Sequence, residues 1–119
     1  NERVVSGLPY NEFLICSILY WNQTREAPRE LTATDLCGET KILKSQMNRT
    51  LNSLEKKGLI ERTRSEKDKR QVYVSFRMER ADVYEKEHER LMDRIGWEHS
   101  EEIVKLFHLI AKMADEVIG

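Results

Sequence analysis

The chain has 119 residues, of which 39% are hydrophobic and 34% are charged, and its formal net charge is −1. These values predict one domain with a modest core, and the sequence contains no run of about 18 apolar residues that could form a transmembrane helix. The first ten residues lack the apolar core of a signal peptide, and two cysteines make no disulfide framework. We therefore expect a cytoplasmic protein that does not contact a membrane.

The sequence also lacks the common catalytic motifs. It contains no glycine-rich phosphate loop, no nucleophile elbow and no HExxH segment. The three histidines, His88, His99 and His108, are too widely spaced for an ordinary metal site. We expect neither an enzyme nor a bound cofactor.

The first predicted helix opens at Leu8 and Pro9, because proline is tolerated in the first helical turn. Glu12 lies in that turn, where a negative charge favours the helix dipole. The helix should end by about Thr24, since residues 27–28 (Ala-Pro) cannot continue it. Its apolar residues are spaced for one buried face: Phe13, Leu14, Ile15, Ile18, Leu19 and Trp21.

A short second helix is predicted after Thr32, which has an acidic residue, Asp35, three positions later, as in a capping box. Leu36 and Cys37 should point inward, and residues 38–41 should form a turn.

The third predicted helix covers about residues 44–57. Met47, Leu51 and Leu54 lie on one helical face, preceded by Ile42. Gly58 is the expected C-terminal glycine. The opposite, polar face carries Lys44, Ser45, Gln46, Asn48, Arg49 and Asn52.

After Gly58 the hydrophobic period changes from helical to alternating. Residues 59–64 and 71–77 are predicted strands. Residues 65–70 contain five charges and no glycine, so they should form an exposed hairpin tip. Helix, turn, helix and charged hairpin in this order predict a winged helix-turn-helix, a mainly α fold with a small β-hairpin.

The remaining residues predict two helices, 81–95 and a last one from about residue 100, separated by Gly96. We assign residues 1–80 to the winged helix-turn-helix region and residues 81–119 to a helical dimerisation region of the same structural unit. The last helix should pack on its copy in a homodimer; the alternative is that it folds back onto its own winged domain. Its apolar stripe comprises Ile103, Leu106, Phe107, Ile110, Met113, Ala114 and Val117.

Positive charge is concentrated in residues 41–80. This stretch has twelve Lys and Arg against five Asp and Glu, or +7, and the rest of the chain therefore carries −8. Clustered cations attract phosphate, because binding releases condensed counterions. Charge alone does not distinguish such a site from a solvated helix with a charged hairpin. Together with the order helix, turn, helix and hairpin, the charge indicates that the partner is double-stranded DNA.

At this point the sequence resembles the multiple antibiotic resistance regulator (MarR) family. Residues 36–60 align without gaps with the helix-turn-helix of that family, including the segment LEKKGLI at 54–60. The wing motif follows as Asp68, Lys69 and Arg70. The resemblance covers residues 8–76 well and the C-terminal helices in layout only. It implies a homodimeric regulator of a pseudo-palindromic operator, typically a repressor released by a small aromatic ligand and in some branches by cysteine oxidation.

The resemblance also implies roles for individual residues. Gln46 and Asn48 would pair with adenine, and Arg49 or Lys44 with guanine or phosphate. Arg70 would enter the minor groove, and Asp68 would orient Arg70 or brace the hairpin. The alternative is that the two form an exposed ion pair, which would contribute only about 0–1 kcal/mol to stability. Leu43 departs from the family, which often has a serine cap at this position. The predicted DNA-binding residues are Lys44, Ser45, Gln46, Asn48, Arg49, Asn52, Arg64, Lys67, Asp68, Lys69 and Arg70.

Two alternatives stay open. One is a winged-helix protein-interaction module without DNA binding. The other is a redox-sensing regulator based on Cys16, although Cys16 lies among apolar residues, where a free cysteine is commonly a buried hydrophobe. Cys37 is likewise predicted to belong to the core. Tyr20, Trp21 and Trp97 are candidates for a ligand cavity, or else for core and interface positions.

Overall fold

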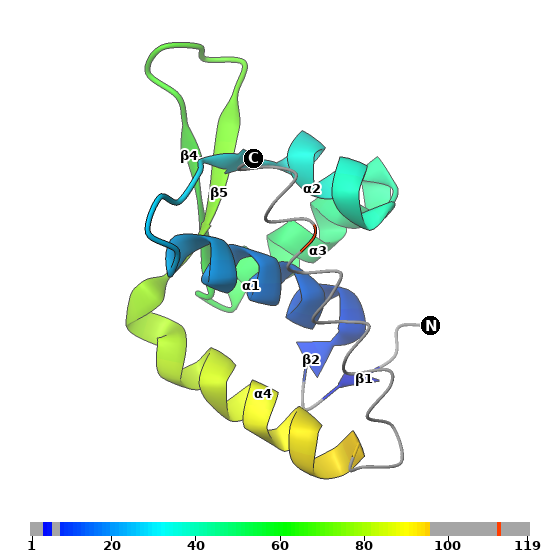
Figure 1. Cartoon of the computed structure of the whole chain (residues 1–119). Helices are drawn as coiled ribbons and strands as arrows, with labels where there is room; N and C mark the ends of the chain where they lie inside the picture. Colours follow the sequence, from blue (N-terminus) through cyan, green and yellow to red (C-terminus); the bar gives the residue numbers. More distant parts are fainter. Residues whose placement is uncertain (1–3, 6–7, 96–111, 113–119) are drawn as a thin grey trace.

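The computed structural model describes residues 4–5, 8–95 and 112. Figure 1 shows a group of packed helices with a small sheet at one side, whose β-hairpin projects from one end, so the predicted winged-helix class is confirmed. The elements in chain order are β1 (Val4–Val5), β2 (Leu8–Pro9), α1 (Tyr10–Gln23), β3 (Leu31–Thr32), α2 (Ala33–Thr40), α3 (Lys44–Lys56), β4 (Ile60–Arg64), β5 (Val72–Phe76), the 3-10 turn η1 (Met78–Arg80) and α4 (Ala81–Ile95).

The first helix begins two residues later than predicted. Leu8 and Pro9 form β2, which pairs with β1 in an antiparallel register, Val5 opposite Leu8. Pro9 is the N-cap of α1, with φ −56° and ψ 150°. These angles are extended, and the fixed φ of proline suits them as well as it suits a helix. The sequence could not distinguish a strand from a first helical turn here, because the choice depends on the pairing of Val4 with Pro9 and of Val5 with Leu8.

The second helix is longer than predicted. Thr32 and Asp35 form the predicted capping box, in which the Thr32 hydroxyl accepts from the Asp35 N–H and the Asp35 carboxylate accepts from the Thr32 N–H. The predicted turn at 38–41 is wrong, because α2 continues through Gly38 to Thr40. Lys41 ends it in the left-handed region, at φ 65°. A glycine inside a helix costs only about 0.5–1 kcal/mol, so Gly38 did not have to end it.

The third helix closely matches its prediction. Met47, Leu51 and Leu54 are completely buried. The chain leaves α3 at Gly58, whose φ of 74° is readily adopted only by glycine. A Cβ at this position would also lie 3.2 Å from Nη1 of Arg80. The glycine therefore permits the sharp passage from α3 into β4.

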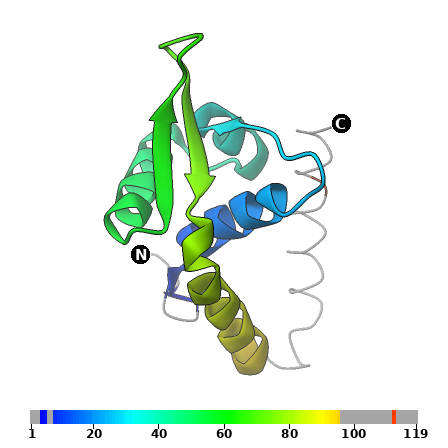
Figure 2. The ribbon, with the colours of Figure 1, turned by 90° about the vertical axis from the view of Figure 1, so that its left-hand side faces the viewer.

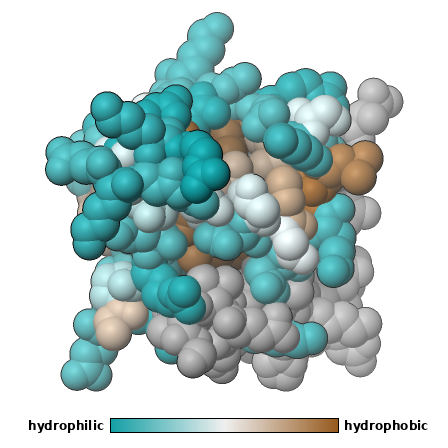
Figure 3. Space-filling model, turned by 90° about the horizontal axis from the view of Figure 1, so that it is seen from above, coloured by the Kyte–Doolittle hydropathy of each residue, from teal (hydrophilic) through white to brown (hydrophobic). Residues whose placement is uncertain are grey.

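The sheet has three strands in the order β3-β5-β4, all antiparallel. β4 and β5 form the predicted hairpin, with Ile60 opposite Phe76 and Arg64 opposite Val72. Figure 2 shows this hairpin extending beyond the helices. Seen from above, the same end of the molecule is covered largely by hydrophilic residues, with a smaller apolar area between them (Figure 3). The strand β3 was not predicted, because two residues are too few to show an alternating pattern.

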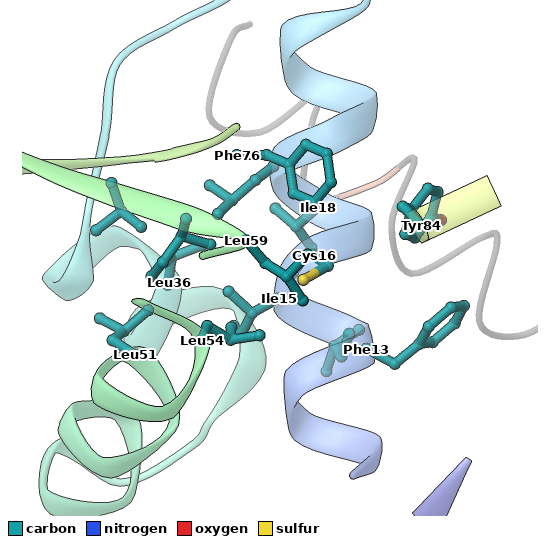
Figure 4. Packing of buried hydrophobic residues seen from close by; sticks show 14 of the residues in the cluster. Phe13, Ile15, Cys16, Ile18, Leu36, Leu51, Leu54, Leu59, Phe76 and Tyr84 are labelled. Carbon is teal, nitrogen blue, oxygen red and sulfur yellow. The ribbon is translucent and has the colours of Figure 1, made fainter. Parts of the chain in front are cut away.

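The core is built around α1, in which every residue from Glu12 to Leu19 is buried. Figure 4 shows α2, α3 and the hairpin packing on one side of this helix, and Tyr84 of α4 stacking near Phe13 on the other. The Phe13 and Tyr84 ring centroids are 5.6 Å apart, and the Tyr84 hydroxyl donates to Oγ of Ser17 at 2.9 Å. Residues 81–95 therefore share one core with the winged region.

Trp21 is an exception to the predicted buried face, since 42% of its surface is exposed. Its neighbour Tyr20 takes the core position instead, packing against Phe76 and Tyr84 with centroid distances of 6.0 and 4.6 Å. No helix within the described ranges is long and apolar enough to cross a membrane. The predicted dimerisation residues lie outside the described residues: Ile103, Leu106, Phe107, Ile110, Met113 and Val117.

Candidate nucleic-acid interface

The polar face of α3 is open to solvent. Lys44, Ser45, Asn48, Arg49 and Asn52 are exposed, and Gln46 is half-buried. The helix is held from behind by its buried apolar face, so this row of side chains is presented on a fixed support. The predicted members of the α3 surface therefore lie together and are accessible.

A buried carboxylate fixes the C-terminal end of α3. Glu12 is 4% exposed, and its Oε1 accepts from Nζ of Lys57 at 2.6 Å. Its Oε2 accepts from the hydroxyl of Ser53 at 3.1 Å. Glu12 thus joins the first turn of α1 to the last turns of α3. We name this set of contacts the Glu12 clamp; the sequence offered only the dipole argument for Glu12, because its partners are more than forty positions away.

The other side of α3 is tied to the hairpin by Arg62, which was not among the predicted site residues. Nη2 of Arg62 lies 2.6 Å from Oδ1 of Asn52 and 2.6 Å from Oε1 of Glu55. The hydrogen bond from Arg62 holds the pKa of Glu55 below its usual range. Asn52, predicted to be a DNA-binding residue, therefore uses its carbonyl oxygen to hold β4. The alternation of β4 could have suggested Arg62, but not which α3 residues it meets.

The tip of the hairpin is ordered by its own side chains. Oγ of Ser65 accepts from the N–H groups of Lys67 and Asp68, at 3.2 and 3.1 Å. The N–H of Gln71 donates to the Asp68 carbonyl, and the N–H of Ser65 donates to the Gln71 carbonyl, both at 2.9 Å. The Arg64 side chain donates a hydrogen bond through Nη1 to the Lys69 carbonyl. The loop is therefore closed despite having no glycine.

Arg70 and Asp68 form an ion pair at this tip. Nε of Arg70 lies 3.1 Å from Oδ1 of Asp68, and Nη2 lies 3.3 Å from Oδ2. The Arg70 side chain is 90% exposed, against 38% for Asp68. Hydrogen bonds from the Arg70 side chain and N–H lower the pKa of Asp68. The carboxylate is ionised at neutral pH, and the pair is lost only as pH falls through this lowered value.

The other predicted tip residues, Arg64, Lys67 and Lys69, are exposed. The structure thus brings the predicted residues into two groups, one on α3 and one at the hairpin tip. Arg62 connects the base of the hairpin to α3. No cluster of His, Cys, Asp and Glu within residues 8–95 is suited to a metal ion.

The family model described as MarR family matches residues 6–71, which is more than half of the chain. This chain belongs to the MarR family. The predicted resemblance is therefore confirmed, and the chain is a winged-helix, DNA-binding transcription regulator. MarR-family regulators are generally not enzymes. None of the curated proteins compared with the chain matches it significantly.

Solved structures of similar fold agree with this assignment. The YusO protein from Bacillus subtilis is 21% identical, with a TM-score of 0.64 over 92% of this chain and 77% of that one. The transcriptional regulator BldR from Sulfolobus solfataricus is 22% identical, with a TM-score of 0.64 over 87% and 73%. NadR in complex with 4-hydroxyphenylacetate is 25% identical, with a TM-score of 0.64 over 92% and 76%.

In this MarR-family chain Cys16 does not have the properties of a redox sensor. Its side chain is 1% exposed, and burial, together with the charge of Glu12, raises the pKa of the Cys16 thiol to about 12. A reactive cysteine needs access and a lowered pKa, and Cys16 has neither. Cys37 is half-buried and packs against the core. Cys16 therefore occupies the core position predicted for it, whereas Cys37 lies at the edge of the core.

Replacing Arg62 with alanine should weaken binding of duplex DNA by this regulator about tenfold. The change removes a cation and leaves the exposed carboxylate of Glu55 unneutralised beside α3, where it would repel phosphate. The midpoint of thermal unfolding should change little, because exposed ion pairs contribute little to stability. Fluorescence anisotropy with a labelled duplex would measure the affinity.

Two further variants make the Arg62 test specific. Arg77→Ala removes the same charge from a residue that pairs at 3.8 and 3.6 Å with Glu61 and Glu79 and acts on Glu55 of α3 only through its charge, without a hydrogen bond. It should cost less affinity than Arg62→Ala. Adding Glu55→Gln to Arg62→Ala should restore part of the binding. Equal losses for the two arginines, with no recovery, would mean that only net charge matters.

Proposed function

We propose that this chain represses transcription as a homodimer, each protomer inserting α3 into the major groove of a pseudo-palindromic operator and the hairpin tip into the adjoining minor groove. The observation that carries the proposal is the exposure of the polar α3 face and of the cationic tip, joined through Arg62. Residues 41–80, which contain both, carry a charge of +7 in a chain of −1. Phosphate attraction and base-edge contacts would then come from neighbouring surfaces.

Within this proposal, Gln46 and Asn48 are assigned to adenine, Lys44 and Arg49 to guanine or phosphate, and Arg70 to the minor groove. Arg64, Lys67 and Lys69 would contact phosphate. Asn52 is assigned a double role, because its amide nitrogen can donate to DNA while its oxygen accepts from Arg62. Dimerisation is assigned to residues 81–119, through the stripe from Ile103 to Val117.

The effector is proposed to be a small aromatic molecule. NadR, at 25% identity, is described in complex with 4-hydroxyphenylacetate, which supports this class of ligand. Tyr20 and Trp21 lie edge to face at a centroid distance of 5.5 Å on α1. Release of DNA by such a compound would support repression, and tighter binding would favour activation.

The decisive experiment is selection of binding fragments from a random DNA pool, followed by affinity measurements at several salt concentrations. We expect two inverted half-sites about 34–36 Å apart, one turn of B-DNA, and an affinity that falls steeply with salt, by about 10³-fold or more between 50 and 200 mM. A protein-interaction module would enrich no sequence and show no steep salt dependence. Selected sites without inverted symmetry would contradict the homodimer.

A further inference from the structure

One large apolar side chain stands out beside the α3 surface. Leu43 is 72% exposed, whereas the other exposed large hydrophobic residues in the described part of the chain are between 37% and 42% exposed. It immediately precedes α3, and the residues on either side of the turn, Lys41 and Lys44, are exposed cations. Single exposed leucines are common on protein surfaces, so the exposure of Leu43 alone supports no conclusion. The argument depends instead on its position at the N-terminus of α3.

The backbone that carries Leu43 is fixed. The side chain of its neighbour Ile42 packs against the core, and the Ile42 N–H donates to Oγ1 of Thr40 at 3.2 Å. The Thr40 hydroxyl in turn donates to the Leu36 carbonyl at 2.6 Å. On the other side, the Leu43 carbonyl accepts from the Met47 N–H at 2.8 Å. Leu43 is therefore presented in a defined place and not on a loose loop.

Folding does not account for a leucine at this position. Leu43 is the N-cap of α3 and makes no side-chain hydrogen bond to the helix. Ser, Thr, Asp and Asn are favoured at N-caps because their oxygens accept from the free N–H groups of the first turn. A serine would both cap the helix and remove exposed apolar surface. In the free protein Leu43 therefore lowers stability in two ways, because it provides no cap for α3 and exposes an apolar side chain to water.

A partner that covers the Leu43 side chain would have to be apolar and would have to lie at the N-terminus of α3. Helix-turn-helix proteins place the first residues of this helix against base edges in the major groove. The apolar group exposed there is the 5-methyl group of thymine, which side-chain carbon atoms can contact. The cations at positions 41 and 44 match the phosphates that border such a site.

We propose that Leu43 is a specificity-determining residue, which recognises one thymine in each half-site by contact with its 5-methyl group. This inference rests on the proposed function, because it needs α3 to enter the major groove. It differs from the assigned hydrogen-bonding contacts in depending on no polar atom. It also explains why a residue that weakens the helix N-terminus is present.

The test uses the fragment obtained by selection from the random pool. Each thymine of a half-site is replaced in turn by deoxyuridine, which removes only the 5-methyl group, and affinities are measured for the wild-type chain, Leu43→Ala and Leu43→Ser. At one thymine per half-site the wild-type chain should lose about fourfold in affinity, as expected for one methyl group withdrawn from an apolar contact. The two variants should show no loss at that thymine.

Two controls complete the test. Met78→Ala shortens another exposed apolar side chain, 40% exposed on η1 and away from the α3 N-terminus, and should keep the wild-type dependence on thymine. Leu43→Ser should also raise the midpoint of thermal unfolding, because it adds a cap.

The outcomes separate this inference from the proposed function. If the selection enriched no duplex, both the proposed function and this inference would be wrong. Sequence-specific binding in which no thymine methyl matters, or matters equally for Leu43→Ala, would overturn the role of Leu43 alone. An altered oligomeric state of Leu43→Ala with unchanged DNA binding would also overturn it, since Leu43 would then serve contacts between copies.

Discussion

Replacing Arg70 with alanine should lower operator affinity about tenfold or more. Its side chain is 90% exposed, and its guanidinium is oriented by Asp68 through two hydrogen bonds of 3.1 and 3.3 Å. A preordered cation loses less conformational entropy when it enters a narrow minor groove, where the negative potential is strongest. The slope of log affinity against log salt should decrease by about one for each protomer. Anisotropy titrations at several salt concentrations would measure both quantities.

Arg90→Ala is the matched control for this prediction. Arg90 is also an exposed arginine in an ion pair, 3.1 Å from Glu87, but it lies on α4. The variant has the same net charge as Arg70→Ala, so any general effect of charge on DNA binding appears in both. Affinity and salt slope that are unchanged in Arg70→Ala, or changed equally in an Arg90→Ala variant with the oligomeric state and thermal midpoint of the wild-type chain, would exclude the proposed function of the hairpin tip.

Replacing Lys57 with alanine should lower the free energy of unfolding by about 2 kcal/mol. The change leaves the Glu12 carboxylate, whose side chain is 6% exposed, with the Ser53 hydroxyl as its remaining donor from α3. Removing one partner of a fully buried ion pair costs about 3–5 kcal/mol, and we expect less here because Lys57 is 40% exposed. The midpoint of thermal unfolding should fall by about 10 °C, measured by circular dichroism.

Lys56→Ala and a second change at Glu12 test the cause. Lys56 is an exposed lysine in the same last turn of α3, and its loss should cost much less stability. Adding Glu12→Gln to Lys57→Ala should recover stability, because burying a neutral amide costs less free energy than burying an unpaired carboxylate. If the two lysine variants were equally stable, the Glu12 clamp would contribute nothing to folding.

The elements predicted well are those whose signal lies within a few residues. The capping box of Thr32 and Asp35, the apolar face of α3 and the glycine at 58 each depend on contacts three or four positions apart. The hairpin followed from its alternation and its charged connection. For the same reason the sequence alone was enough to place the candidate residues on the polar face of α3 and at the hairpin tip.

What the sequence did not predict depends on residues far apart along the chain. The strand β3 exists because Leu31 pairs with Val74, and β2 because Leu8 pairs with Val5. Glu12 and Lys57 meet across forty-five positions, and Arg62 reaches Asn52 and Glu55 across the turn between α3 and β4. No local periodicity contains such pairs, so the residues that position the α3 surface were missed although its members were named.

The place of α1 in the core couples both ends of the molecule. Through Glu12 this helix is bonded to α3, and through Ser17 and Tyr20 it is bonded to Tyr84 and Glu85 of α4, at 2.9 and 3.0 Å. A tilt of α4 must therefore either carry α1 with it or break these two hydrogen bonds. Under the proposed function, strain that arises in α4 would reach α3 through α1, and substitutions at Glu12, Ser17 or Tyr20 would interrupt this coupling.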